Sequence, residues 1–218
     1  MVVTRILLFF ILPAFSLTGC QVNSATPRAV ELPGRDLAVA IQVKPDATPL
    51  EKINAAAIEQ ITQTTSYDSA YVKLDYPNGD VPLETGVCAD VIVRAFRKAD
   101  VDLQKELHED MKRNFSKYPQ KWGARRPDRN IDHRRVPNLM TWFDRQGKNL
   151  PITKDAKDYQ PGDIVAWELD SGLLHIGMVS KIKVEGADRY AAVHNIGAGA
   201  RLEDVLFAWK IIGHYRYF

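Results

Sequence analysis

The spacing of the apolar residues changes once along this chain, and this change restricts the possible folds more than any other feature. Between residues 48 and 147, apolar side chains recur at three- and four-residue intervals, which predicts helices that pack on a core. From Asp163 onward, short runs rich in Val, Ile, Trp and Tyr are separated by Gly and Asp, which predicts an antiparallel sheet. Helices first and strands afterwards indicate an α+β domain, which we place at residues 48–218.

This pattern predicts four helices and four strands. The clearest start is Thr48-Pro49-Leu50-Glu51, where a capping hydroxyl, a proline in the first turn and a glutamate form the capping-box pattern. That helix should end near Thr64, and a second helix should open at Cys88. The other predicted elements are a helix through Leu103, Leu107, Met111 and Phe115, a short helix through Leu139, Trp142 and Phe143 that Gly147 closes, and strands over 163–167, 175–179, 190–194 and 211–218.

The first twenty residues have the features of a secretion signal. Arg5 precedes an apolar run that is too short for a stable membrane-spanning helix, so we predict that residues 1–19 are a signal peptide. The run Leu17-Thr18-Gly19-Cys20 resembles the bacterial lipobox, in which the cysteine becomes the acylated amino terminus. This resemblance implies that a lipid on Cys20 anchors the protein to a membrane. The alternative is an ordinary signal peptide with a chance cysteine.

The residues after the lipobox are expected to connect the membrane to the domain. Gln21, in place of an aspartate, resembles the outer-membrane sorting pattern of Gram-negative lipoproteins, which implies a periplasmic protein anchored to the outer membrane. Residues 20–47 contain three prolines and a glycine without a sustained apolar period, which predicts a tether. One short strand could lie within residues 36–43.

Charge and cysteine content restrict the classes of function. The formal net charge is +2, so the chain lacks the large excess of positive charge that is typical of nucleic-acid-binding proteins. The mature chain has the length of one domain, and we expect a monomer. If Cys20 carries lipid, Cys88 has no partner in its own chain for a disulfide. In an oxidising compartment an unpaired thiol is a liability unless it is buried, paired between chains or used chemically.

Cys88 is a candidate nucleophile because we expect it in the first turn of a helix. Backbone amides and the positive end of the helix dipole favour the thiolate there, and can bring the pKa of a thiol into the range of about 3.5–7.5. The same amides can stabilise the oxyanion that forms when a thiolate attacks an acyl carbon. His175, at the start of a predicted strand, is the candidate base. The alternatives are a buried hydrophobic cysteine and a core histidine.

The order of these motifs resembles the NlpC-type cysteine peptidases, papain-like enzymes that cut peptidoglycan stem peptides. The likeness spans residues 67–207, and its strongest parts are Pro161-Gly162-Asp163 before one strand and His175-Ile176-Gly177 in the next. At the nucleophile, Val87-Cys88-Ala89-Asp90 stands where most such peptidases have Asp-Cys-Ser-Gly, which puts their substrate contacts in doubt. Asp90 could bind a substrate amine or favour the amino end of the helix.

The resemblance implies a role for each matching residue. Cys88 corresponds to the nucleophile, His175 to the general base, and His194 to the polar residue that orients the imidazole of the base. Asn195 is the alternative third residue, but strand alternation points it to the opposite face unless a bulge intervenes. No metal or other cofactor is expected, because the histidines are dispersed without close ligand spacing.

Over nearly the whole mature domain, the chain resembles more closely a family of bacterial envelope proteins of unassigned function, allied to the NlpC type. Within the run 132–135, the guanidinium groups of Arg134 and Arg135 suit the carboxylates of peptidoglycan stems, while a salt-bridged connector is the alternative. Trp122 could line the substrate groove or serve only in packing. The segments that carry this likeness are 86–90, 131–138, 194–197 and 213–216.

These features predict a cell-envelope cysteine hydrolase. We expect the thiol of Cys88, assisted by His175, to attack an amide of a peptidoglycan stem or cross-link and to form an acyl-enzyme that water releases. One alternative keeps the site but acts on lipid esters or transfers acyl groups. The other alternative is a catalytically silent lipoprotein that binds the cell wall.

Overall fold

The computed structural model describes residues 27–218. The predictions of a signal peptide, of a lipobox at Cys20 and of sorting through Gln21 lie outside the described residues. Within residues 27–218, no helix has the length and apolar character needed to cross a membrane.

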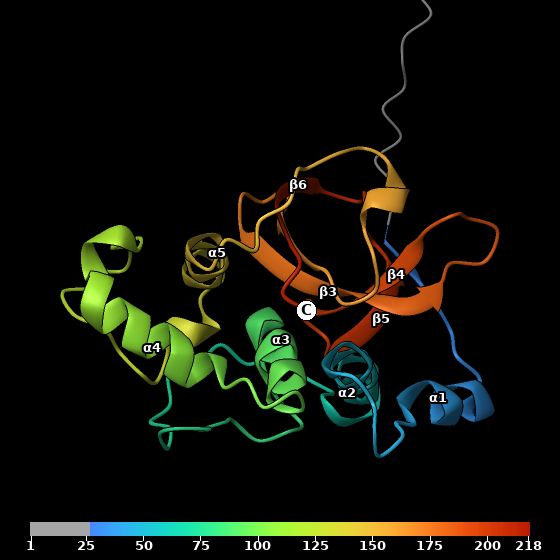
Figure 1. Ribbon diagram of the computed structural model, residues 1–218, viewed down its shortest axis with the longest axis horizontal. Coiled ribbons are helices and arrows are strands. Elements are labelled where there is room, and N and C mark those ends of the chain that lie inside the picture. Colours follow the sequence, from blue (N-terminus) through green and yellow to red (C-terminus); the bar gives the residue numbers. More distant parts are fainter. Residues whose placement is uncertain (1–26) are drawn as a thin grey trace, which may run out of the picture.

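The described residues form one antiparallel sheet with helices packed against it (Figure 1). The strand order is β1-β5-β4-β3-β2-β6. Strand β3 is central, and its neighbours bring His175 beside Trp167 of β2 and Gly177 opposite His194 of β4. The strands are β1 (Arg28–Ala29), β2 (Ile164–Glu168), β3 (Leu174–Lys183), β4 (Tyr190–Asn195), β5 (Ala200–Asp204) and β6 (Lys210–Tyr215).

Helices α2 and α3 pack on the sheet, and α1 and α4 lie at opposite ends of the molecule (Figure 1). Helix α3 contacts β3, the strand that carries His175, and α2 contacts β5. This architecture is the α+β class predicted from the sequence. The helices are α1 (Gly34–Ile41), α2 (Pro49–Gln63), α3 (Cys88–Arg97), α4 (Leu103–Asn114) and α5 (Val136–Arg145), with short 3-10 turns at Phe115–Lys117, Asp132–Arg134 and Ala156–Asp158.

Both faces of the sheet are buried, because apolar side chains occupy both sets of alternating strand positions. Ile176 and Met178 of β3 point into the main core, which they share with Ile92 and Phe96 of α3. Val179, at the alternate position of the same strand, faces a second, smaller core. Its members are Tyr159, Val165, Trp167, Val179, Ala192, Val205, Leu206 and Ala208.

The predicted elements are confirmed where the local signal was strong. Thr48 caps α2 as expected: its hydroxyl accepts from the Glu51 backbone at 3.2 Å, and the Glu51 carboxylate accepts from the Thr48 backbone at 2.8 Å. Helix α3 starts at Cys88, and Gly147 follows α5 with a φ of 65°, in the left-handed region where glycine is favoured. The four predicted strands correspond to β2, β3, β4 and β6.

The tether prediction is wrong for part of residues 20–47. Arg28 and Ala29 pair with β5, so the folded unit begins before residue 48. Residues 36–43 do not contain the suggested strand, because most of them belong to α1. Leu37, Ala40 and Ile41 share one helical face there and pack against the core.

Candidate active site

Cys88 is the first residue of α3, at the amino end that faces the sheet. The carboxylate of Asp90 accepts a hydrogen bond from the backbone N–H of Val87 at 2.7 Å. It thereby occupies one of the donors that the first turn of a helix leaves free. The helix start that carries the thiol is therefore fixed by an interaction within its own first turn.

Arg134 forms a buried ion pair with Asp90. Its Nε lies 3.0 Å from Oδ1 of Asp90 and its Nη2 lies 3.0 Å from Oδ2, with side-chain exposures of only 2% and 4%. The remaining guanidinium donors bond to the carbonyls of Ala70 and Asp68. Because both charges are satisfied within the protein, this geometry favours the helix-stabilising alternative for Asp90 over amine binding.

Asn195 also holds the segment that leads into α3. Its side-chain amide donates to the carbonyl of Gly86 at 2.9 Å and to that of Ser66 at 3.3 Å. Asn195 and His194 thus point to opposite faces of β4, as strand alternation predicts. The structure uses Asn195 to position the loop before Cys88 and brings His194, not Asn195, to His175.

Three buried residues on neighbouring strands, His175, His194 and Glu203, form a hydrogen-bonded series. His175 Nε2 lies 2.9 Å from His194 Nδ1, and His194 Nε2 lies 3.0 Å from Glu203 Oε2. The hydrogen bond from His194 lowers the pKa of Glu203, so this carboxyl group is ionised and can only accept. In the tautomer in which Nε2–H of His194 donates to Glu203, Nδ1 of His194 accepts from Nε2–H of His175. This leaves Nδ1 of His175 as the nitrogen that can take up a proton.

Aromatic rings enclose His175. The indole of Trp167 stacks on the imidazole with centroids 5.8 Å apart, and Trp209 meets it edge-on at 5.8 Å. Burial lowers the pKa of His175 to about 3, and the neighbouring His194 adds to the effect. The imidazole is therefore uncharged at neutral pH.

Burial also determines the charge state of Cys88, the candidate nucleophile. It raises the pKa of the Cys88 thiol to about 11, although the backbone N–H groups of Ile176, Ala89 and Cys88 itself act in the opposite direction. The prediction of a thiolate with a pKa of about 3.5–7.5 is therefore wrong for the free protein. The helix start does favour the thiolate, but desolvation of the charge outweighs this effect.

The link between the helix and the sheet runs through Ile176. Its backbone N–H reaches the sulfur of Cys88, and Ile176 directly follows His175 in β3. Side chains alternate along β3, so Ile176 faces the main core with Cys88, whereas His175 faces the other side of the sheet beside Trp167. Within residues 27–218, no hydrogen bond joins Cys88 to His175. Cys88 with its helix-end amides and the His175–His194–Glu203 series are therefore two neighbouring groups that the backbone of β3 connects.

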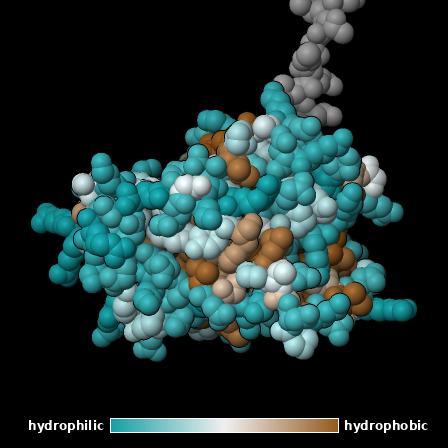
Figure 2. All heavy atoms as spheres, viewed as in Figure 1, coloured by the Kyte–Doolittle hydropathy of each residue, from teal (hydrophilic) through white to brown (hydrophobic). Residues whose placement is uncertain are grey.

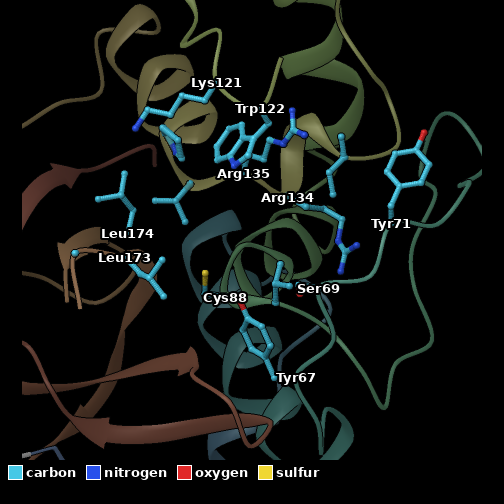
Figure 3. A pocket seen from close by; sticks show the side chains of 15 residues that line it. Tyr67, Ser69, Tyr71, Cys88, Lys121, Trp122, Arg134, Arg135, Leu173 and Leu174 are labelled. Carbon is cyan, nitrogen blue, oxygen red and sulfur yellow. The ribbon is translucent and has the colours of Figure 1, made fainter. Parts of the chain in front are cut away.

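A pocket of about 580 Å³ opens over Cys88. Figure 3 shows the sulfur between Leu173 on one side and Ser69 with Arg134 on the other, while Trp122 and Arg135 stand on the facing wall. The volume falls within the range typical of small-molecule sites. His175 is buried and does not line this pocket. Cys88 therefore forms part of the pocket surface, with the histidine series set within the protein.

The predicted binding residues occupy different places in this site. Arg135 and the exposed Trp122 both line the pocket, and the guanidinium lies 4.4 Å from the indole centroid. Arg134 also lines it, but its charge is used by Asp90.

Within residues 27–218, no group of three or more His, Cys, Asp or Glu side chains could hold a metal ion.

Two residues of the site were not identified from the sequence. Glu203 lies in β5, a strand that was not predicted, although Ala200, Leu202 and Asp204 alternate with it as strand positions do. Tyr67 points toward Cys88 in Figure 3, and burial, followed by the charge of Cys88, raises the pKa of its phenol. Its position in an irregular loop gave no periodic signal from which this placement could be predicted.

Comparison with known proteins places the chain in a family. Residues 54–217 match the family model described as "Domain of unknown function (DUF1287)". The chain is also 60% identical over 165 residues to the "Uncharacterized protein YijF" of Escherichia coli (strain K12), which covers 74% of this chain and 78% of that protein. No solved structure matches the chain. The protein therefore belongs to the DUF1287 family.

Proposed function

We propose that this protein is a cysteine hydrolase of the papain-like NlpC type that cleaves an amide bond in peptidoglycan stem peptides or cross-links. The observation that carries the proposal is Cys88 at a helix start, on the surface of an open pocket and next to the strand that bears the His175–His194–Glu203 series. In this proposal a lipid on Cys20 anchors the enzyme to the outer membrane, and the domain works in the periplasm.

The proposed reaction begins with a neutral thiol and a neutral imidazole. The substrate carbonyl binds over Cys88, and in this proposal binding brings the imidazole of His175 within hydrogen-bond reach of the sulfur. The S–H proton then passes to Nδ1 of His175, and the sulfur forms a bond to the carbonyl carbon. The helix-end N–H groups of Cys88 and Ala89 stabilise the resulting oxyanion. The imidazolium then protonates the leaving amine as the C–N bond breaks, which leaves a thioester on Cys88.

Water completes the cycle. His175 removes a proton from a water molecule that attacks the thioester carbon, and the proton returns to the sulfur as the acyl product leaves. Glu203 does not take part in proton transfer. Through His194 it holds the tautomer in which Nδ1 of His175 is free, and it stabilises the positive charge that His175 acquires.

Purified sacculi provide the direct test. The soluble domain is incubated with sacculi, and the released and cross-linked muropeptides are identified by mass. We expect cleavage of stems or cross-links by the native protein and loss of that cleavage in Cys88→Ala. Equal cleavage by both proteins would exclude Cys88 as the nucleophile. Hydrolysis of lipid esters without change in muropeptides would select the lipid-directed alternative.

A second candidate function is cell-wall binding without catalysis. Two observations favour it: the pKa of Cys88 is raised to about 11, and His175 is buried beneath the pocket surface. Forming the thiolate–imidazolium pair is therefore unfavourable until substrate contacts offset the cost. Sedimentation of both native protein and Cys88→Ala with sacculi, with no new muropeptide from either, is the result that this candidate predicts.

A further inference from the structure

A second compartment of about 540 Å³ adjoins the pocket over Cys88. The two share Tyr71, Trp122, Ile131 and Arg135 among their lining residues, so they lie side by side. We call the second part the arginine compartment, because Arg126, Arg129 and Arg135 line it. It borders α4 through His108, and the surface over α4 is largely hydrophilic in Figure 2.

The arginine compartment carries an excess of positive charge. Arg126 and Arg129 form no ion pair with any carboxylate of residues 27–218. Arg135 lies 3.3 Å from Asp132 but stays partly exposed beside the indole of Trp122. One acid lines the compartment, Asp128, and its carboxylate already accepts from Tyr71 and Asn130.

One residue of the same wall, His108, also carries a polar atom without a partner among the described residues. Nδ1 of His108 is buried and has no hydrogen-bond partner within the described part of the chain. Such groups are uncommon in folded proteins, because an unpaired buried polar atom is costly. Burial lowers the pKa of His108, so its ring is uncharged and can still donate one hydrogen bond. A ligand with several oxygens could accept hydrogen bonds from the three guanidinium groups beside it.

We infer that the arginine compartment binds free carboxylates of an extended peptide whose scissile carbonyl lies over Cys88. This inference rests on the proposed function, and it adds a substrate requirement: an acidic peptide should bind better than its neutral amide. Guanidinium groups suit carboxylates because they offer planar pairs of donors. Phosphate sites more often use backbone N–H groups at a helix start, whereas α4 presents His108 from its middle.

Binding can be measured without turnover in the Cys88→Ala protein. The two probes are a stem peptide with free carboxylates and the same peptide with every carboxylate converted to an amide, titrated by calorimetry at low salt. We expect the acidic peptide to bind at least about tenfold more tightly, with the difference shrinking as salt rises. Arg126→Gln combined with Arg129→Gln should abolish the difference. Arg35→Gln, an exposed arginine of α1, should leave it unchanged.

Three results would overturn the inference. These are equal affinity for the two peptides, acid preference that survives in the double arginine variant, and stronger binding of inorganic pyrophosphate than of the acidic peptide. Failure of the proposed hydrolase function gives a different set of results from failure of the carboxylate site. Selective binding of the acidic peptide by Cys88→Ala, together with no cleavage by the native protein, would retain the carboxylate site and reject the hydrolase. Cleavage by the native protein, together with equal affinity of Cys88→Ala for the two peptides, would reject the carboxylate site alone.

Discussion

Among single side chains, Glu203 has the clearest assigned role, because its only polar contact within the described residues is His194 Nε2. Its carboxylate sets the tautomer of His194, and His194 in turn sets that of His175. Glu203 is thus a positioning residue that acts through two imidazoles. The proposed nucleophile and base could be named from the sequence, but this carboxylate could not.

Glu203→Gln should lower kcat about a hundredfold with little change in KM, because an amide does not fix the proton of His194 on Nε2. The tautomers can be read directly from the nitrogen-15 shifts of the two imidazoles, which require no substrate. Glu168→Gln, at an exposed ion pair with Lys210, is the matched control. Unchanged imidazole shifts and an unchanged kcat in Glu203→Gln would contradict the role of Glu203.

Alkylation of Cys88 should report its raised pKa. Since only the thiolate reacts, the rate with iodoacetamide should rise about tenfold per pH unit from pH 6 to 9.5 without a plateau. At pH 7.5 it should be about a hundredfold below that of free cysteine. A plateau below pH 8 would instead show a resting thiolate, as the sequence had suggested.

The sequence predicted those parts of the candidate site that local features of the chain indicate. Cys88 and His175 were found through a helix start and a strand start, which are local features. The protonation state of Cys88 was not predictable, because it depends on burial by residues distant in the chain. The same is true of Asp90, whose partner Arg134 lies 44 residues away.

Among the secondary-structure elements, α3 is the one whose placement the site requires. Asp90 closes its first turn, Arg134 joins that turn to the loop at residues 68–70, and Asn195 holds Gly86. Three segments distant in sequence therefore converge at the end of the helix that bears the thiol. Their shared contacts explain why the helix start is rigidly placed without a capping side chain at Val87.

Asp90→Asn should destabilise the domain by about 3–5 kcal/mol, since it leaves the buried guanidinium of Arg134 without a counter-charge. Urea unfolding followed by circular dichroism measures the change in the free energy of unfolding. The exposed pair Lys210–Glu168 supplies the comparison: Glu168→Gln should cost less than about 1 kcal/mol. Similar small losses in both variants would show that the Asp90–Arg134 pair does not hold α3.

Elements with strong periodic patterns were predictable, whereas α1, β1 and β5 were not. Helix α1 is only eight residues long, and three prolines and a glycine within residues 27–47 favoured a tether. Strand β5 is five residues long and carries Arg201, Glu203 and Asp204, so its alternation is short and polar. Both gain their stability from packing against residues far along the chain, which local propensity does not record.

Considered as a whole, the molecule buries several ionisable groups in a single folded unit, so its stability should depend on pH. Burial lowers the pKa of His133 to about 3, with Arg97 and Arg134 adding to the effect, and His175 is lowered to about 3 as well. The unfolded chain protonates both histidines below pH 6.5, whereas the folded protein does not. Stability is therefore full above pH 6.5 and is lost as the pH falls toward 3.

Between pH 7.5 and pH 4.5 the free energy of unfolding should fall by about 2.5 kcal/mol for each of these two histidines. Urea unfolding at the two pH values measures the loss. His133→Gln should remove one of the two contributions and so reduce the difference by about half. A difference that is the same in the variant and the native protein would show that His133 is not buried uncharged.

The central claim is that Cys88 forms a covalent bond to the acyl group of a peptidoglycan peptide. Acid quenching at short times after mixing with a stem peptide, followed by mass spectrometry of the digested protein, tests it most directly. We predict that the peptide containing Cys88 gains the mass of the acyl fragment, and that Cys88→Ala gives neither adduct nor product. Products without any adduct that depends on Cys88, or neither adduct nor product from the native protein, would contradict the proposed hydrolase.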